Sequence, residues 1–204
     1  MRRACSVAVL SLVLWLAACA SRTPLTERDG VHAQTPAGLE RTPDAVPRIE
    51  PIRLGGPNKP YEALGYSVVP LAGDVGLREQ GLASWYGNKY HGRPTSSGEV
   101  YDMFAMTAAH RTMPIPSYAR VRNPANGREV IVRINDRGPF APGRIVDLSY
   151  TAALKLGVLG GVAPVVVERI TFDEIRSGRW RRDPPPDDPR SDPRSDPRAR
   201  ELLP

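Results

Sequence analysis

The sequence is poor in the residues on which several large protein classes depend. Of its 204 residues only two are cysteine and three are histidine, and there is no CxxC pair and no Cys/His cluster with zinc spacing. A disulfide-rich scaffold and a zinc-cluster protein are therefore excluded. Long apolar runs are also missing beyond the first 20 residues, which excludes a protein with several membrane-spanning helices.

Proline, in contrast, is present in excess, and its distribution divides the chain. The 22 prolines are about twice the usual share, and only seven of them lie between residues 81 and 178. We therefore expect one compact domain over 81–174, between a disordered tether over 19–56 and a disordered tail over 175–204 with tandem SDPR repeats. A lead-in segment over 57–80 has the pattern of a small hairpin.

The first 18 residues have the pattern of a signal peptide. A basic start, Met1-Arg2-Arg3, precedes an apolar stretch from Ala4 to Leu16, and two alanines then lead directly into Cys19. This arrangement resembles the lipobox of bacterial lipoproteins, in which the cysteine is acylated and becomes the new N-terminus. We expect lipidated Cys19 to anchor the protein to a membrane. An ordinary secretory signal, cleaved at the same small residues, is the alternative.

The formal net charge of +6 is modest and unevenly placed. Two of these charges leave with the signal peptide, and the segment 81–178 has 12 basic and 8 acidic side chains, or +4. This excess favours an acidic polymer of the cell envelope as a partner, and it is far too small to indicate nucleic-acid binding.

The compact segment has the pattern of a small β-barrel, because short apolar strands alternate with Gly- and Pro-rich turns. Ser149 is a good N-cap for a two-turn helix over 150–156, and Gly157 would end that helix. We therefore expect a mostly β fold with one or two short helices. The expected strands are residues 82–86, 103–108, 119–122, 129–134, 145–148 and 165–172.

Three places in this segment carry polar residues that a barrel core would not need. A Gly-punctuated loop over 87–99 ends in Glu99, a strand ends at His110, and Asp136 follows an apolar strand directly before a Gly-Pro turn. Each residue alone is explained more simply: Asp136 as a turn cap, Glu99 as a solvated acid, His110 as a core histidine. Two carboxylates and a histidine on one small barrel would together suit glycosidic acid/base chemistry.

Five motifs occur in order between Gly81 and Gly157: ASWYG, HGRPTSSGEVYDM, TAAHRTMPIPSYARVRN, VRINDRGPF and GRIVDLSYTAALKLG. The stretch resembles the RlpA family (rare lipoprotein A), and the likeness extends to Phe172. Members of that family are endolytic peptidoglycan lytic transglycosylases built on a six-stranded double-psi β-barrel.

The resemblance implies cleavage of the MurNAc–GlcNAc β-1,4 bond, preferably in glycan strands that lack stem peptides, to give 1,6-anhydroMurNAc ends. By position it makes Asp136 the catalytic acid/base. Glu99 and His110 would line the same groove: Glu99 to favour protonated Asp136 through its like charge and to stabilise the cationic centre, His110 to orient one of the two acids.

The resemblance also suggests which residues hold the glycan. Trp85 is better explained as a core residue than as a stacking platform. We expect no cofactor and no metal ion. The expected glycan-binding residues are Tyr86, Tyr90, His91, Arg93, Asn135 and Arg137.

As partners we expect peptidoglycan glycan strands, and the membrane through Cys19, for a monomer in the cell envelope that is attached to the outer membrane and faces the periplasm. We expect no SPOR domain after Phe172, so septal targeting is not implied. The alternative to an enzyme is a non-catalytic, expansin-like glycan-binding lipoprotein that tethers membrane to cell wall.

Overall fold

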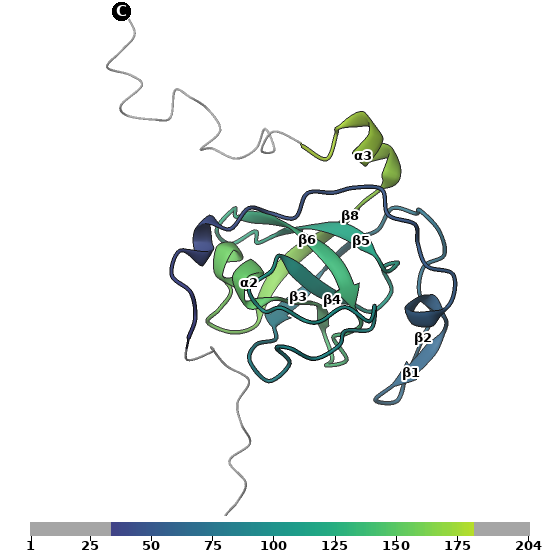
Figure 1. The fold of residues 1–204 in the computed structure, drawn as a ribbon, viewed down its shortest axis with the longest axis horizontal. Helices are drawn as coiled ribbons and strands as arrows, with labels where there is room; N and C mark the ends of the chain where they lie inside the picture. Colours follow the sequence, from purple (N-terminus) through teal and green to yellow (C-terminus); the bar gives the residue numbers. More distant parts are fainter. Residues whose placement is uncertain (1–33, 182–204) are drawn as a thin grey trace, which may run out of the picture.

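Six strands form a closed barrel whose order differs from the order of the strands in the chain. The structure, a computed structural model, describes residues 34–181, and in it the order around the barrel is β3-β7-β4-β6-β5-β8 (Figure 1). The strands are β3 (Arg78–Trp85), β4 (Thr107–His110), β5 (Ser117–Arg122), β6 (Glu129–Asp136), β7 (Arg144–Leu148) and β8 (Ala163–Ile170). The pairs β3–β7 and β4–β6 are parallel and the other pairs antiparallel. The predicted mostly β barrel is confirmed.

Strand β6 shows why these sequences close into a barrel. Val130, Val132 and Ile134 alternate along it and lie in the apolar interior. Ile131 points to the other side, where it packs with Tyr118 and Ile170. A strand buried on both faces reads as an almost continuous apolar run, as this one does.

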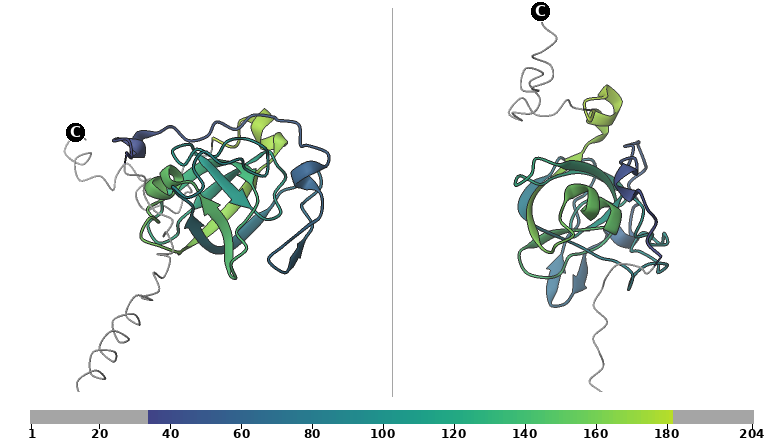
Figure 2. Two further views of the ribbon diagram at one scale, coloured as in Figure 1. Left: turned by 60° about the horizontal axis from the view of Figure 1, so that its bottom comes forward. Right: turned by 90° about the vertical axis from the view of Figure 1, so that its left-hand side faces the viewer.

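Helix α2 (Tyr150–Leu156) agrees with its predicted bounds. The Ser149 side chain accepts a hydrogen bond from the backbone N–H of Ala152, and Gly157, with a φ of 76°, ends the helix in the left-handed conformation. Ala152, Ala153 and Leu156 of α2 join the interior cluster, and the right-hand view of Figure 2 shows the helix across the ring of strands. Within residues 34–181 no helix is long and apolar enough to cross a membrane.

Several strand predictions have wrong limits. Strand β3 starts at Arg78, four residues before the expected 82, because residues 78–80, which were expected in the lead-in segment, pair with β8. The strand expected over 103–108 starts only at Thr107, because Met103 is buried by packing beside the barrel and not by strand pairing. Strand β8 ends at Ile170, where Thr171 and Glu174 form a reciprocal capping box that starts helix α3 (Phe172–Ser177).

The segment 34–58, which we call the N-terminal belt, lies along the barrel. This corrects the expectation of a disordered tether for residues 34–56. Strand β4 is short and leaves part of the β6 edge unpaired; there Asp44 accepts from the N–H of Ile131, and Ala45 donates to its carbonyl. Asp44 also forms an ion pair with Lys155 of α2. Figure 1 shows the belt running from beside α2, through the short 3₁₀ turns η2 (Leu39–Arg41) and η3 (Gly56–Asn58), toward the hairpin.

The predicted hairpin is present as β1 (Tyr61–Ala63) and β2 (Tyr66–Val68), joined by a turn through Leu64 and Gly65. At the other end, residues 175–181 were assigned to the tail but also contact the barrel. Arg120 donates to the carbonyl of Trp180, whose ring packs on the outer apolar cluster of Tyr118, Ile131 and Ile170. The SDPR repeats and the predicted signal peptide lie outside the described residues.

Replacing Gly81 by alanine should destabilise the barrel by about 1–3 kcal/mol, measured by urea denaturation. A Cβ at Gly81 would lie 2.6 Å from Cγ2 of buried Ile145, so β3 or β7 must shift. Gly160→Ala is the matched control, because no heavy atom lies within 4 Å of its added Cβ. Equal unfolding free energies for the two variants would contradict the close approach of β3 and β7.

Candidate active site

One groove of the described structure contains two carboxylates, Asp136 and Asp147. It has a volume of about 400 Å³ and lies where β6 ends, beside β7 and the end of β4. Tyr86 and Tyr90 line it, and so does the hairpin tip at Leu64. The groove thus combines acids with aromatic and apolar walls, the usual composition of a site for a small or narrow ligand.

Asp136 is held at one oxygen by three donors. Its Oδ1 accepts hydrogen bonds from the backbone N–H groups of Ser96 and Arg137, both at 2.8 Å, and from the Ser96 hydroxyl at 2.6 Å. Its Oδ2 makes no hydrogen bond to the described residues. The carboxylate is therefore fixed in orientation and has one oxygen left for a ligand.

The loop that carries Ser96 is itself anchored. The N–H of Ser97 donates to the carbonyl of Asn135, and the Ser97 hydroxyl shares a hydrogen bond with Thr95. From the N-terminal belt, the Arg53 side chain donates to the Ser97 carbonyl at 2.6 Å. The position of Asp136 thus depends on both the loop and the belt.

Asp147 of β7 was not among the predicted site residues. Its side chain is 16% exposed, accepts a hydrogen bond from the Ser84 hydroxyl at 2.5 Å, and lies 3.4 Å from a guanidinium nitrogen of Arg144. Burial raises the pKa of Asp147, and Ser84 and Arg144 offset only part of that effect. The signal in the sequence was an acid inside the apolar strand RIVDL, because a buried acid needs a specific reason to be there.

Strand pairing places the two acids on either side of Ala109. Ala109 of β4 is opposite Asp136 in the parallel pair with β6 and opposite Asp147 in the antiparallel pair with β7. Adjacent strands are about 4.8 Å apart, so the backbones of the two aspartates are about 10 Å apart. All three residues line the groove, and the small Ala109 side chain leaves room between the carboxylates.

Glu99 is committed to a different network. Its Oε2 accepts hydrogen bonds from Arg133 at 2.6 Å and from Asn135 at 3.0 Å. Burial alone would raise the pKa of Glu99, but these hydrogen bonds outweigh it and lower the pKa. Its carboxylate is held by Arg133 and Asn135 and does not line the groove with Asp136, so the structure does not support the expectation that it acts on Asp136 by like-charge repulsion.

Arg133 also binds Glu50 of the N-terminal belt. Nε and a terminal nitrogen of Arg133 each lie 2.9 Å from one oxygen of Glu50, a bidentate pair. The hydrogen bond from Arg133 is the main reason that the pKa of Glu50 falls to about 2, and a hydrogen bond from Tyr118 adds to it. Sequence reasoning missed Glu50 because it lies in a segment without strand or helix pattern.

His110 faces another carboxylate. Its ring is 1% exposed, and Nδ1 accepts from the backbone N–H groups of Thr112 and Met113. Its Nε2 lies 3.5 Å from Oε2 of Glu79, at the outer limit of hydrogen-bond distance. This interaction with His110 is the main reason that the pKa of Glu79 is lowered. The expectation that His110 orients Asp136 or Glu99 is corrected: within residues 34–181, the carboxylate beside its ring is that of Glu79.

Of the expected glycan-binding residues, the two tyrosines are best placed. Tyr86 is buried and stacks on Tyr101, with ring centroids 4.1 Å apart, and Tyr90 packs edge-on against Tyr86 and is 42% exposed. Trp85 packs edge-on against Tyr150 in the core, as expected.

The other four have different surroundings. Arg137 lines the groove, but its guanidinium donates to the carbonyls of Pro57, His110 and Met113 and to the Asn58 side chain. Asn135 is buried beneath the loop. Neither His91 nor Arg93 lines the groove, and His91 accepts from the N–H of Met103. These contacts favour structural roles.

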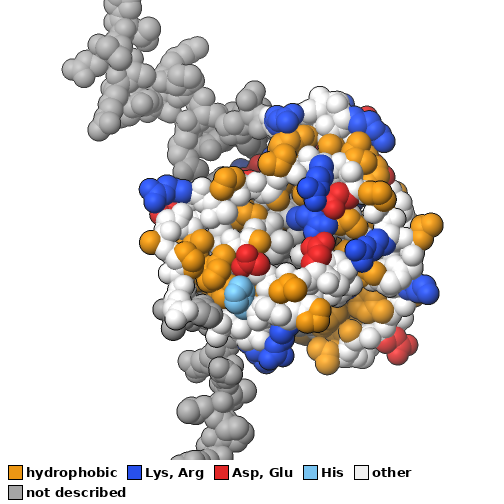
Figure 3. All heavy atoms as spheres, viewed as in Figure 1, with side chains coloured by type: hydrophobic (Ala, Val, Ile, Leu, Met, Phe, Trp, Pro, Cys, Tyr) orange, Lys and Arg blue, Asp and Glu red, His pale blue; other side chains and the backbone are white. Residues whose placement is uncertain are grey.

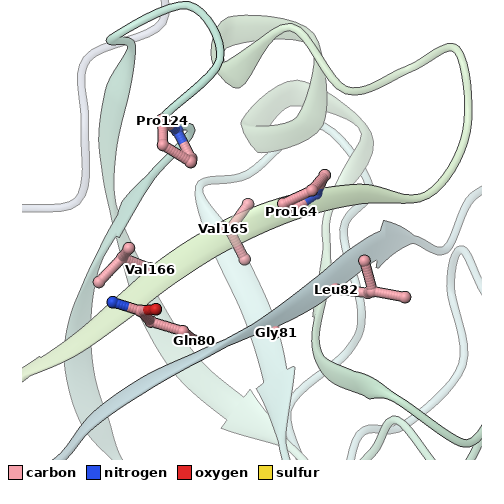
Figure 4. A pocket seen from close by; sticks show the side chains of 7 residues that line it. All are labelled: Gln80, Gly81, Leu82, Pro124, Pro164, Val165 and Val166. Atoms are coloured by element: carbon pink, nitrogen blue, oxygen red, sulfur yellow. The ribbon is translucent and has the colours of Figure 1, made fainter.

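A second concave region lacks this chemistry. The hollow in Figure 4 lies over β3 and β8 and is lined by Gln80, Gly81, Leu82, Pro124, Pro164, Val165 and Val166, none of which titrates. No group of three His, Cys, Asp or Glu side chains in residues 34–181 could hold a metal ion. On the face in Figure 3, basic and acidic side chains are intermixed.

Comparisons with known proteins agree on one family. Residues 78–167 match the family model described as lytic transglycolase, a DPBB domain. The chain is 50% identical over 167 residues to the endolytic peptidoglycan transglycosylase RlpA of Vibrio cholerae, covering 81% of this chain and 63% of that protein. It is 48% identical over 147 residues to the protein of the same name from Neisseria meningitidis, covering 72% and 59% of the two chains. The chain thus spans less than two thirds of these relatives.

The likeness to solved structures is lower. Streptomyces papain inhibitor is 22% identical, with a TM-score of 0.37 over 46% of this chain and 94% of that one. The expansin of Clavibacter michiganensis is also 22% identical, with a TM-score of 0.35 over 47% and 52% of the two chains.

Proposed function

The chain belongs to the RlpA family of double-psi β-barrel proteins, and on this premise we propose that it is a lytic transglycosylase that cleaves the MurNAc–GlcNAc β-1,4 bond of peptidoglycan. The single observation that carries the proposal is Asp136, fixed by three hydrogen bonds at one oxygen and lining an open groove. A catalytic carboxylate needs this combination of fixed geometry and access to a ligand.

The proposed chemistry is an intramolecular substitution. The C1–O4 bond breaks as O4 of GlcNAc gains a proton, an oxocarbenium-like centre develops at C1 of MurNAc, and the C6 hydroxyl oxygen closes onto C1 while losing its proton. The product is a 1,6-anhydroMurNAc end, and no water is consumed. Asp136 is the group we place at these reacting atoms, with Tyr90 and Tyr86 along the sugar path.

We extend the proposal to substrate form and location. The family resemblance favours glycan strands without stem peptides, and the lipobox-like pattern ending in Cys19 favours attachment to the outer membrane on its periplasmic side. Mass spectrometry of the N-terminal peptide from native protein and from Cys19→Ser tests the attachment. An acylated peptide is expected only from the native chain.

Sacculi provide the test of activity. The chain without its signal peptide and Cys19, residues 20–204, is incubated with intact and with amidase-stripped sacculi, and soluble products are identified by mass spectrometry. Anhydro ends released faster from stripped sacculi are the expected result. Binding without products would favour the non-catalytic tether, and reducing ends would replace the intramolecular step with hydrolysis. A fragment that begins at residue 57 is unsuitable, because it lacks Glu50 and Arg53 of the belt.

Removing the Ser96 hydroxyl should lower the rate of product release about tenfold and leave glycan binding unchanged. Ser96→Ala deletes one of three donors to Asp136 but keeps the backbone N–H, so the carboxylate loses orientation and not position. Ser177→Ala, on α3, removes hydroxyl hydrogen bonds to backbone carbonyls far from the groove residues and is the control. A rate equal to wild type for Ser96→Ala would show that its hydroxyl has no part in orienting Asp136.

A further inference from the structure

The groove offers a second carboxylate that the one-acid chemistry does not use. Asp147 of β7 and Asp136 of β6 lie on either side of Ala109 of β4, and both line the groove. Its side chain is largely enclosed by the barrel and still reaches the groove. A buried acid facing a ligand site is a candidate for proton transfer, because burial disfavours its charged form.

The surroundings of the two acids differ in kind. Asp136 receives three donors at Oδ1, two of them backbone N–H groups that only donate, so this oxygen is an acceptor. Asp147 receives a single hydroxyl, from Ser84, and the one cation beside it, Arg144, is 3.4 Å away. Burial dominates at Asp147 and raises its pKa.

Other charged or titratable groups around Asp147 do not cancel the effect of burial on its pKa. Tyr86, after β3, is buried near both aspartates, and its own pKa is raised well above the usual value, chiefly by burial, so it stays neutral. The guanidinium of Arg137, which follows β6, donates to the backbone carbonyls of Pro57, His110 and Met113. The residue of β4 opposite Asp147 is uncharged Ala109.

We propose that Asp147 is a second catalytic residue, the proton donor to the departing O4 oxygen, and that Asp136 is the base that takes the proton of the C6 hydroxyl. This division of labour rests on the proposed function and refines it. Paired acids in unlike surroundings are a common way to run acid and base chemistry in one site.

The step balances without a co-reactant. The C1–O4 bond breaks and the Asp147 proton goes to O4, while the C6 oxygen forms a bond to C1 and its proton goes to Asp136. After the reaction Asp147 is ionised and Asp136 protonated, and one proton exchanged with solvent at each restores the starting state. No electrons are transferred and no water enters the product.

The pH dependence of the reaction rate distinguishes a proton donor from a residue with a purely structural role. The rate must fall as pH rises through the pKa of the donor. The Ser84 hydrogen bond lowers the pKa of Asp147, so Ser84→Ala should move this alkaline limb to higher pH. Ser117→Ala is the matched control: Ser117 is also buried in a barrel strand, and its hydroxyl has no partner among the described residues. The alkaline limb of the Ser117→Ala pH–rate profile should stay at the wild-type pH.

A substrate whose leaving group needs no proton distinguishes the role of Asp147 from that of Asp136. Asp147→Asn in residues 20–204 should cut the release of anhydro ends from stripped sacculi at least about a hundredfold. It should cleave the 4-nitrophenyl β-glycoside of GlcNAc-MurNAc at close to the wild-type rate, because nitrophenolate departs unprotonated. Asp136→Asn should be slow on both substrates. Circular dichroism establishes that each variant is folded.

Three results would overturn the assignment while leaving the proposed function standing: a wild-type rate on sacculi for Asp147→Asn, an equal loss on both substrates, or an unmoved limb in Ser84→Ala. Absence of anhydro ends from the wild type itself would overturn the proposed function and this assignment together.

Discussion

Replacing Asp136 by asparagine is expected to reduce the release of anhydro-ended glycan by about a thousandfold while sacculus binding stays within twofold of wild type. Asparagine keeps an oxygen where the N–H groups of Ser96 and Arg137 donate, so the loop should stay in place. It has lost the charge needed to accept a proton, so the chemical step alone is affected. Initial rates on stripped sacculi and a pelleting assay measure the two quantities.

A matched variant separates this effect from a general change of charge. Asp173 is an exposed acid on α3, paired only with Arg179, and Asp173→Asn should keep the wild-type rate. If Asp136→Asn released products at more than a tenth of the wild-type rate, Asp136 would not be the acid/base. The reaction would then depend on other acids of the groove.

Glu50→Gln is expected to lower the free energy of unfolding by about 1–2 kcal/mol at pH 7. Glu50 is largely buried by its partners, and its pKa is about 2 in the folded protein against an ordinary 4.5. A pKa depressed this far corresponds to at most about 3 kcal/mol, and solvent screening of a partly exposed ion pair reduces it to about 1–2 kcal/mol. The variant keeps the size of the side chain but loses the charge that Arg133 binds.

The pH dependence of this loss has a definite sign. A carboxylate whose pKa is depressed by folding contributes its stability fully above pH 4.5 and loses it as pH falls toward 2. The gap between wild type and Glu50→Gln should therefore narrow from pH 4.5 downward, which urea denaturation at several pH values measures. Glu62→Gln, at an exposed site of β1, is the control and should show no such gap. A gap independent of pH would mean that the loss comes from packing and not from charge.

Local signals in the sequence predicted the parts of the fold that local interactions determine. Helix α2 was bounded correctly because Ser149 and Gly157 act within a few residues of its ends. The strands around the Asn-Gly turn were placed for the same reason. In contrast, the strand limit near Met103 was wrong, because its burial comes from Tyr86 and Tyr101 across a loop.

The site shows the same division. Asp136 and Tyr90 were predicted and lie in the groove, since Asp136 ends strand β6 and Tyr90 lies in the loop after β3. The partners of Glu99 and His110 were not predictable, because Arg133 and Glu79 meet them only through barrel closure. Asp147 was hidden because it occupies one position of an apolar strand, and Glu50 because ion pairs and not apolar periodicity hold the belt in place.

The N-terminal belt also limits how far the groove can lie from a membrane anchor at Cys19. With Cys19 as the predicted point of attachment, only the chain from residue 19 to residue 34 separates the membrane from the first described residue, and fully extended it spans at most about 50 Å. A free segment running to residue 56 would span about 130 Å. With attachment at Cys19, a belt that lies along the barrel would confine the groove to the layer of cell wall nearest the membrane, and lengthening the segment before residue 34 should then bring more distant glycan within range.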